Sequence, residues 1–427
     1  MTLLEAMSYG IPCISSDCMS GPRDMIKPGI NGELYAPGAI DDFVGHLNQV
    51  ISGEVQYQHA IIPGTIERFY DMLYFKILKM RYSRNYKSDH YEQKIFEEEV
   101  IQQTLDYNYT QHSDANKLNI AYGIDKNFLF GCGVSIASIL LANPAKALAF
   151  HVFTDSFGPE DRQRFEALAK QYATQIIIYL IDCERLKSLP STKNWTYATY
   201  FRFIIADYFS DKTDKVLYLD ADIACKGSIQ KLIDLNFAEN EIAAVVAEGE
   251  LEWWTKRSVS LATPGLVSGY FNAGFILINI PLWTAENISK KAIEMLKDPE
   301  VVQRITHLDQ DVLNILLVNK ARFVDKNFNT QFSLNYELKD SVINPVNADT
   351  VFVHYIGPTK PWHSWGAYPV SQYFLQAKLN SPWSDYALLN PVTSHQLRYA
   401  AKHMFNQKRY TSGIAYYIAY FKRKLLE

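Results

Sequence analysis

The chain has 427 residues, 21% of them charged, and a formal net charge of −4 at pH 7. This length predicts two or three domains, and a hydrophobic fraction of 48% is sufficient for a large buried core. The balanced charge argues against a general nucleic-acid-binding protein, because phosphate recognition produces a strongly basic face or domain.

The cysteine pattern indicates a reducing compartment. The five cysteines, which form no Cys-X-X-Cys pair and no zinc-type spacing, are Cys13, Cys18, Cys132, Cys183 and Cys225. We interpret them as free thiols of a cytoplasmic protein, packed as small buried hydrophobic groups. Met1 leads directly into a helical pattern, so no signal peptide is expected. The longest apolar run, 128–142, is shorter than the roughly 20 residues that span a bilayer.

The sequence changes character along the chain. Residues 1–74 form one fragment. Residues 75–115 are polar, charged and rich in tyrosine, which predicts a linker with a docking helix at about 93–106. From 116 to 370 short strands alternate with helices, and 371–427 form a helical C-terminal region.

The alternation after residue 116 predicts an α/β fold. Strands are expected at 119–123, 149–155, 175–181 and 215–219, with helices at 128–141, 159–172 and 196–209. The segment 175–181 is apolar almost throughout, which is typical of a strand buried on both faces of a parallel sheet. Strands alternating with helices imply βαβ units and a doubly wound sheet, whose ligands lie at the carboxyl ends of the strands.

Two carboxylates follow the strand at 215–219 directly, as Asp220-Ala-Asp222. Carboxylate oxygens suit Mg²⁺ or Mn²⁺, and such an ion stabilises the negative charge of a departing nucleoside diphosphate as a Lewis acid. An isolated Asp-X-Asp is equally compatible with a solvated turn or the start of a helix.

A second polar element, His354-Tyr-Ile-Gly-Pro-Thr-Lys, follows an expected strand at 350–353. His354 would supply an imidazole as a third metal ligand. Gly357 would let the backbone approach phosphate closely, and Lys360 would pair with phosphate as a point charge. His307 is a competing metal candidate, but it lacks the accompanying Gly and Lys.

Together these motifs resemble the retaining glycosyltransferase family 8. In the order of the family, the segments that carry the resemblance are Asn119-Ile-Ala-Tyr-Gly-Ile-Asp-Lys-Asn-Phe, Ala198-Thr-Tyr-Phe-Arg, Leu217-Tyr-Leu-Asp-Ala-Asp, Tyr270-Phe-Asn-Ala-Gly-Phe, Leu308-Asp-Gln-Asp and His354-Tyr-Ile-Gly-Pro-Thr-Lys-Pro-Trp-His. Within the family, the chain is similar to the lipopolysaccharide core α-1,3-galactosyltransferases and α-1,3-glucosyltransferases of enteric bacteria. The resemblance implies a single Rossmann-like GT-A domain with a helical C-terminal extension.

The resemblance also implies roles for individual residues. Asp220, Asp222 and His354 would hold Mn²⁺ or Mg²⁺ against the diphosphate of UDP-glucose or UDP-galactose. The substrate-binding residues would be Asp125 and Asn127 at the uridine, Arg202 at the donor sugar or phosphate, Asn272 near the donor sugar, and Gly357 and Lys360 at the diphosphate. Asp309 and Gln310 would form the catalytic pair on the reactive face of the sugar.

Several of these residues have simpler interpretations. Arg202 would be a surface ion-pair former on a helix, and Asn272 would cap a turn before a strand at 275–278. One of Asp309 and Asp311 would only cap the helix that begins there. Trp362 and His363 are expected to be structural or to lie on the acceptor side.

The reaction mechanism stays open between two alternatives. Retention of anomeric configuration suggests a protein nucleophile, by analogy with retaining glycosidases, and Asp309 and Gln310 are the candidates. A front-face displacement, in which the leaving phosphate helps to deprotonate the acceptor, needs no such nucleophile and is the mechanism that we favour. Some relatives carry an acidic acceptor-binding residue after the strand expected at 242–246, where this chain offers Glu248 or Glu250.

Basic and aromatic residues are interleaved from 396 to the end of the chain. This pattern suits an amphipathic anchor on the anionic cytoplasmic face of the inner membrane, which would make the protein a peripheral membrane protein. The alternative is a helical cap that packs on the sheet.

The N-terminal fragment resembles a different family, the retaining glycosyltransferase family 4. Its segment Glu5-Ala-Met-Ser-Tyr-Gly-Ile-Pro is characteristic of the nucleotide-sugar site of that family, where Glu5 would bind the donor ribose. About 74 residues cannot form its two-domain cleft, so we expect an incomplete GT-B Rossmann fragment without catalytic activity, fused to a complete family 8 enzyme. Its exposed apolar faces would favour loose packing.

The sequence therefore predicts transfer of glucose or galactose from a UDP-sugar to the lipopolysaccharide outer core. One alternative is another kind of family 8 enzyme, with a soluble acceptor. A second alternative is a nucleotide-sugar-binding protein inactivated by the fusion.

Overall fold

The structure is a computed structural model that describes residues 13–17, 22, 26–37, 39–52, 100–110, 117–187, 189–190, 197–339 and 341–425. The chain divides into two compact units, residues 1–92 and 93–427. This division falls inside the segment 75–115, which was predicted as a linker.

The first unit contains a small parallel sheet and one helix. Strands β1 (Cys13–Ser16) and β2 (Gly32–Tyr35) pair in parallel, and helix α3 (Ile40–Ile51) follows them. Helix α3 leaves Ile40, Val44 and Leu47 exposed, as expected for a fragment of a larger domain. Glu5 and Cys18 lie outside the described residues.

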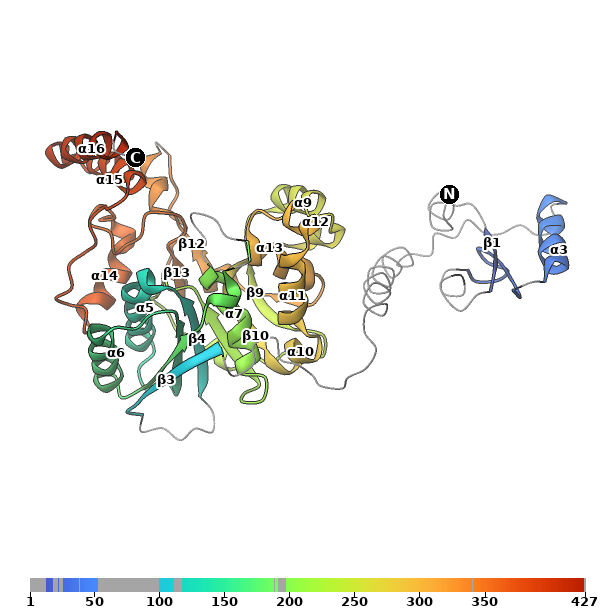
Figure 1. The fold of residues 1–427 in the computed structure, drawn as a ribbon, viewed down its shortest axis with the longest axis horizontal. Coiled ribbons are helices and arrows are strands. Elements are labelled where there is room, and N and C mark those ends of the chain that lie inside the picture. The colour runs from blue at the N-terminus through green and yellow to red at the C-terminus, as the bar shows by residue number, and fades with distance from the viewer. Residues whose placement is uncertain are drawn as a thin grey trace. The chain divides into compact units, whose positions relative to one another are not determined.

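The second unit is built on an eight-stranded mixed sheet with the strand order β11-β9-β10-β7-β4-β5-β6-β3 (Figure 1). Its centre is parallel and confirms four predicted strands, namely β4 (Leu118–Ile124), β5 (Leu148–Thr154), β6 (Gln175–Ile181) and β7 (Lys215–Leu219). The connecting segments also follow the prediction and are α5 (Leu129–Ala142), α6 (Pro159–Gln171), the 3₁₀ turn η4 (Tyr197–Tyr200) and α7 (Phe201–Tyr208). Shorter 3₁₀ turns lie at η2 (Lys126–Phe128) and η3 (Glu184–Leu186).

Successive residues of the central strands point to opposite faces of the sheet. On β4, Ile120 and Tyr122 pack into one apolar core and Ala121 into the other. Because both faces are covered by apolar side chains, these strands are apolar almost throughout. The four described cysteines, Cys13, Cys132, Cys183 and Cys225, are buried free thiols, as predicted.

The other side of the sheet is antiparallel. Strand β10 (Phe271–Asn279) runs antiparallel to both β7 and β9 (Ala243–Ala247), and β11 (Ala321–Phe323) pairs in parallel with β9. The helical elements of this half are α9 (Leu251–Ser260), η5 (Pro264–Ser268), α10 (Ile280–Ala285), α11 (Ile288–Lys297), α12 (Pro299–Val302) and α13 (Leu308–Leu316).

The helix predicted at about 93–106 is wrong in its described part. Residues Ile101–Asn108 form strand β3, which runs antiparallel to β6 at the edge of the sheet. Without β3, the backbone groups of the buried strand β6 would be left unpaired at a sheet edge. Leu105 and Tyr107 also pack against one of the two cores, so tertiary packing outweighs the local preference for a helix.

A second, three-stranded sheet brings distant motifs together. It consists of β12 (Thr330–Gln331), β13 (Phe352–His354) and β8 (Ile223–Cys225). Strand β8 pairs antiparallel with β13, with Ile223 opposite His354. Smaller elements nearby in the sequence are α8 (Gln230–Ile233), η6 (Lys326–Asn329) and η7 (Leu334–Leu338).

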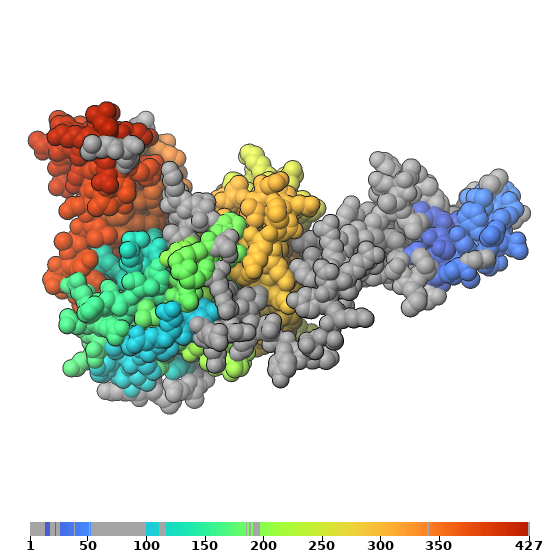
Figure 2. All heavy atoms as spheres, viewed as in Figure 1, coloured from blue at the N-terminus to red at the C-terminus, as the bar shows by residue number. Residues whose placement is uncertain are grey.

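The C-terminal region is helical, as predicted. It contains η8 (Pro369–Ser371), α14 (Gln372–Leu379), α15 (Ser394–Asn406) and α16 (Tyr410–Lys424). Helices α15 and α16 pack against each other and gather at one end of this unit (Figure 2). Among the described residues, no helix is both long and apolar enough to cross a membrane.

Candidate active site and metal centre

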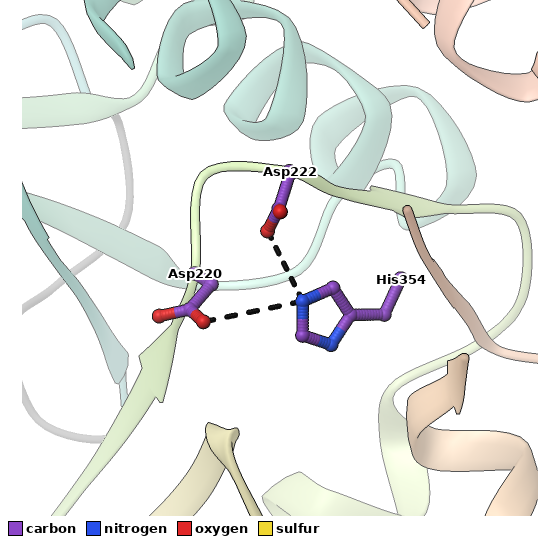
Figure 3. A group of neighbouring side chains, drawn as sticks. All are labelled: Asp220, Asp222 and His354. Carbon is purple, nitrogen blue, oxygen red and sulfur yellow. Dashed lines mark ion pairs between the residues drawn. The ribbon is translucent and has the colours of Figure 1, made fainter. Parts of the chain in front are cut away.

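Asp220, Asp222 and His354 converge at the carboxyl end of β7 (Figure 3). Asp220 directly follows β7, and Asp222 precedes β8, whose pairing with β13 fixes the position of His354. The Nε2 atom of His354 lies 3.1 Å from Asp222 Oδ1 and 3.9 Å from Asp220 Oδ2. One ligand atom from each residue lies within 4.8 Å of the others, so the predicted metal ligands are brought together.

The chemistry of this cluster fits a divalent cation. His354 and Asp222 are only 3% and 8% exposed, and Asp222 Oδ1 accepts no hydrogen bond from the described residues. The Nδ1 atom of His354 is 2.9 Å from Asn329 Oδ1, an interaction that requires a proton on Nδ1. In the neutral ring, the lone pair of Nε2 then faces the two carboxylates, which gives the oxygen and imidazole donors that Mn²⁺ or Mg²⁺ accepts.

Gly274 leaves the space in which an ion would lie. A Cβ atom at this position would be 2.5 Å from His354 Cε1, 2.6 Å from Asp220 Oδ2 and 3.0 Å from Asn272 Oδ1. Gly274 lies on β10, and its carbonyl oxygen accepts a hydrogen bond from the Asp220 amide at 2.8 Å. Any larger residue would therefore fill the centre of the cluster.

Lys360 reaches the same cluster. Its ammonium group donates to Asp222 Oδ2 and, at 2.8 Å, to the Tyr355 carbonyl oxygen. Burial alone would raise the pKa of Asp222, but the charge of Lys360 and the neighbouring His354 ring outweigh burial and hold that pKa below its usual value. Gly357 has a φ of +83°, a left-handed conformation that favours glycine.

Arg202 is buried, so the alternative of a surface ion-pair former is wrong. The side chain lies over the Tyr218 ring, with 4.4 Å between the guanidinium carbon and the ring centroid. Arg202 Nε lies 3.0 Å from Asp309 Oδ2, and its Nη2 lies 3.5 Å from Asp220 Oδ1. Arg202 thus connects a predicted metal ligand with a predicted catalytic carboxylate.

Asp309 and Gln310 lie in the first turn of helix α13, and Gln310 contacts Asn272 and Ala273 of β10. Asp309 accepts a hydrogen bond from Thr199 Oγ1 at 2.6 Å, and burial raises the pKa of Asp309 despite the nearby Arg202. Gln310 Oε1 accepts from the Ala273 amide at 3.0 Å and from Asn272 at 3.2 Å. The side-chain amide oxygen of Gln310 therefore already accepts two hydrogen bonds.

Asn272 lies inside β10 and does not cap a preceding turn. Its Oδ1 atom accepts from the Gly274 amide at 3.0 Å and from Asn329 Nδ2 at 3.1 Å. Its Nδ2 atom donates to Gln310 Oε1 and, at 3.3 Å, to Glu248 Oε2. Asn272 therefore links the metal cluster to Gln310.

Asp311 is the structural member of the Asp309 and Asp311 pair. It is fully buried and accepts from the Thr306 amide at 2.7 Å, the His307 amide at 2.8 Å and Tyr270 Oη at 2.6 Å. Arg257 on α9 is its ion-pair partner. The turn held in this way places Leu308 at φ 44°, a strained conformation for a side chain of this size, immediately before the predicted catalytic pair.

Glu248 is the acidic residue that contacts the site. Its Oε2 atom accepts from Gln310 Nε2 at 2.9 Å, whereas Glu250 is exposed and precedes α9. His307 does not belong to the metal cluster and instead contacts Asp311. Trp362 and His363 are buried among Phe128, Phe374 and Trp365, which agrees with the first of their two expected roles, a structural one.

Asp125 and Asn127 lie at the carboxyl end of β4, the neighbour of β7 in the sheet. Asp125 is buried and accepts from the Asn127 amide at 2.9 Å, which caps the following 3₁₀ turn. Asn127 is exposed. Their contact with a uridine remains a prediction.

Asn329, Thr199 and Arg257 contact the predicted site residues but are not predicted from the sequence. Each acts through a partner distant in the chain, so no local spacing identifies it. Asn329 follows an Asn-Phe pair in a polar stretch, a pattern that indicates only a turn before a strand.

Comparisons with known proteins agree with the two resemblances. Residues 119–366 match the model of glycosyl transferase family 8, residues 368–424 match its C-terminal model, and residues 1–68 match glycosyl transferases group 1. The chain is 93% identical over 334 residues to a lipopolysaccharide 1,3-galactosyltransferase of Salmonella typhimurium LT2, covering 78% of this chain and 99% of that protein. It is 56% identical over 336 residues to the lipopolysaccharide glucosyltransferase WaaO of Escherichia coli K12, with the same coverage.

The N-terminal segment has a separate relative. It is 92% identical over 76 residues to a lipopolysaccharide 1,6-galactosyltransferase of Salmonella typhimurium LT2, but these residues span only 21% of that protein. The predicted fusion of two glycosyltransferase sequences is confirmed. The galactosyltransferase LgtC, solved with donor and acceptor sugar analogs, matches 62% of this chain and 96% of its own chain at 24% identity and a TM-score of 0.54. This likeness confirms the predicted GT-A fold.

Proposed function

Because the chain belongs to glycosyltransferase family 8, we propose that it transfers galactose from UDP-galactose to a hexose of the lipopolysaccharide outer core, forming an α-1,3 link. The observation that carries this proposal is the convergence of Asp220, Asp222 and His354 beside Arg202, Asp309 and Gln310. Galactose is favoured over glucose because the 93% identical relative is a 1,3-galactosyltransferase, whereas the glucosyltransferase is 56% identical.

A divalent ion held by the three ligands would neutralise the charge that develops on the departing diphosphate. Lys360 would move from Asp222 to a phosphate oxygen as a second positive charge. Asp309, held by Arg202 and Thr199, would accept a hydrogen bond from a hydroxyl of the donor sugar. These residues would orient the donor before transfer.

Two observations support a front-face displacement without a protein nucleophile. Gln310 Oε1 already accepts from Ala273 and Asn272, and the Asp309 carboxylate is held by an ion pair and a hydrogen bond. Neither side chain is therefore poised to attack the anomeric carbon. The phosphate oxygen that leaves the sugar would accept the proton of the acceptor hydroxyl.

The donor is tested by UDP release from purified full-length protein with truncated lipopolysaccharide as the acceptor. UDP-galactose and UDP-glucose are offered separately, each with Mn²⁺ and with EDTA. We expect metal-dependent release from UDP-galactose. Release from UDP-glucose alone would reassign the donor, and UDP binding without release from either sugar would favour the inactive nucleotide-sugar-binding protein.

Helix α16 supports a peripheral position at the cytoplasmic face of the inner membrane. Tyr410, Ile414, Ile418 and Phe421 are 58%, 52%, 52% and 60% exposed, and their spacing places them along one side of the helix. The basic residues flanking this apolar face are Lys408, Arg409, Lys422, Arg423 and Lys424. An apolar face with basic flanks suits the surface of an anionic bilayer.

We predict that the double variant Ile414→Glu and Ile418→Glu binds anionic phospholipid vesicles at least about tenfold more weakly. Each isoleucine that becomes buried in the bilayer would contribute roughly 1.5–3 kcal/mol to binding. Vesicle cosedimentation measures this change. The control is Gln102→Glu with Thr104→Glu, which adds the same charge at exposed positions of β3. Equal binding of both double variants would contradict the membrane position.

The N-terminal unit is proposed to contribute no chemistry. Its described part contains two short strands and one helix, and its relative is matched over only 21% of its length. We predict that Glu5→Ala leaves the kcat/KM for UDP-galactose unchanged, as measured by UDP release. A large loss in this variant, with an unchanged melting temperature, would show that the fragment takes part in catalysis.

A further inference from the structure

Asn329 lies between the metal cluster and the predicted donor-sugar site. It ends η6, is only 2% exposed, and uses both ends of its side-chain amide. Its Oδ1 atom is 2.9 Å from His354 Nδ1, and its Nδ2 atom donates to Asn272 Oδ1 at 3.1 Å. One buried side chain thus contacts a metal ligand and a sugar-site residue.

A backbone group fixes the direction of this chain of hydrogen bonds. The Gly274 amide can only donate, and it lies 3.0 Å from Asn272 Oδ1. The Asn272 atom that faces Asn329 is therefore an oxygen, so Asn329 must present its NH₂ group to Asn272 and its oxygen to His354. His354 then carries a proton on Nδ1, and in the neutral ring the Nε2 lone pair is directed at Asp222.

The same direction continues on the other side of Asn272. Its NH₂ group faces Gln310 Oε1, which also accepts from the Ala273 amide. Gln310 consequently turns its own NH₂ group toward the Glu248 carboxylate, 2.9 Å away. A single arrangement of amides satisfies the whole path from His354 to Glu248.

We propose that Asn329 is a positioning residue that couples the two halves of the site. It would hold His354 in the tautomer that binds a metal ion, and it would hold Asn272 in the orientation that receives the donor sugar. This inference rests on the proposed function. Groups that orient a metal-bound histidine typically change metal affinity by about 10–100-fold when they are removed.

Two substitutions separate the two roles. Asn329→Leu has a similar shape and removes both hydrogen bonds. Asn329→Asp keeps an oxygen for His354 Nδ1 but cannot donate to Asn272 Oδ1. Asn119→Leu is the matched control, because Asn119 is also buried and its Oδ1 lies 3.1 Å from His151 Nε2, near the amino end of β4.

The first measurement is the affinity for Mn²⁺ in the presence of UDP, by calorimetry on the full chain. We expect Asn329→Leu to bind Mn²⁺ about 10–100-fold more weakly, and Asn329→Asp and Asn119→Leu to bind it at least as tightly as the wild type does. In UDP release, Asn329→Asp should lose about tenfold or more in kcat/KM for UDP-galactose, as one buried hydrogen bond is replaced by repulsion. Equal Mn²⁺ affinity of Asn329→Leu and wild type would overturn the role of Asn329 in metal binding. Full activity of Asn329→Asp would overturn its role in holding Asn272 for the donor sugar.

The second measurement does not depend on metal or turnover. Long-range ¹H–¹⁵N NMR of the histidine rings, with His354 assigned through His354→Gln, should show the Nδ1–H tautomer in the wild type and in Asn119→Leu, but not in Asn329→Leu. An unchanged tautomer in Asn329→Leu would overturn the proposal. If Asn329→Leu does not fold, the wild type and Asn329→Asp decide instead. Both should show the Nδ1–H tautomer, and an Nε2–H tautomer in the wild type would overturn the proposal. A locked tautomer in a protein without transferase activity would instead reject only the proposed function.

Discussion

Gly274→Ala is expected to abolish metal binding and to lower kcat/KM for UDP-galactose on the order of a thousandfold, because a metal ion contributes several kcal/mol to stabilising a departing diphosphate. The added Cβ would lie 2.5 Å from His354 Cε1 and 2.6 Å from Asp220 Oδ2, which is closer than real Cβ contacts. Mn²⁺ titration and UDP release measure the two losses. The fold should survive, since Gly274 lies in β10 and does not have the positive φ that would strain alanine.

Gly158→Ala is the control for this prediction. Its Cβ would meet only Asp161 Oδ2, at an ordinary distance of 3.4 Å, so metal affinity and activity should not change. If Gly274→Ala bound Mn²⁺ as tightly as Gly158→Ala did, the ion would lie elsewhere than among Asp220, Asp222 and His354.

Asp311→Asn is expected to lower the free energy of unfolding of the second unit by about 3 kcal/mol or more, because it leaves the buried Arg257 guanidinium without its counter-charge. Burial alone would raise the pKa of Asp311, but hydrogen bonds from Arg257 and Tyr270 lower it below its usual value. The carboxylate is therefore the form that the fold stabilises. Denaturant melts followed by tryptophan fluorescence measure the change.

The same variant should lose activity before it unfolds. Asp311 holds the Thr306 and His307 amides and so maintains the strained turn at Leu308 that presents Asp309 and Gln310. Asp385→Asn, which removes an exposed ion pair with Arg164, is the control and should change neither property, because exposed ion pairs contribute little. A stable and fully active Asp311→Asn protein would show that the turn needs no such anchor.

The part of the site that could be predicted from sequence is the part encoded locally. Asp220 and Asp222 follow a strand whose apolar residues identify it, and His354, Gly357 and Lys360 follow another within seven residues. The family resemblance implied that the two motifs meet. In the structure they meet through a second, smaller sheet, in which β13, ending at His354, pairs antiparallel with β8, which follows Asp222.

The roles of Asp309 and Asp311 could not be separated by sequence. Both lie in the first turn of α13, where either would be a suitable cap. The difference comes from Arg202 and Arg257, which lie on separate helices, because Arg202 pairs with Asp309 and Arg257 pairs with Asp311. Only the tertiary arrangement decides which carboxylate faces the cluster.

Strand β3 shows a similar limit in the fold. The local composition before it favours a helix, whereas the requirement to pair the exposed edge of β6 is a property of the whole sheet. Asn329 is another such case, because its importance depends on His354 and Asn272, which are 25 and 57 residues away in the chain.

The most direct test of the proposed activity is the transfer of labelled galactose from UDP-galactose to truncated lipopolysaccharide by the wild type and by Asp222→Asn. Asp222 is the most buried carboxylate of the metal cluster, and asparagine preserves its shape without its charge. We predict an α-1,3-linked galactose on the acceptor with the wild type and Mn²⁺, and no detectable product with Asp222→Asn or with EDTA. Product of equal amount from Asp222→Asn, or from the wild type in EDTA, would contradict a metal-dependent transfer at this site.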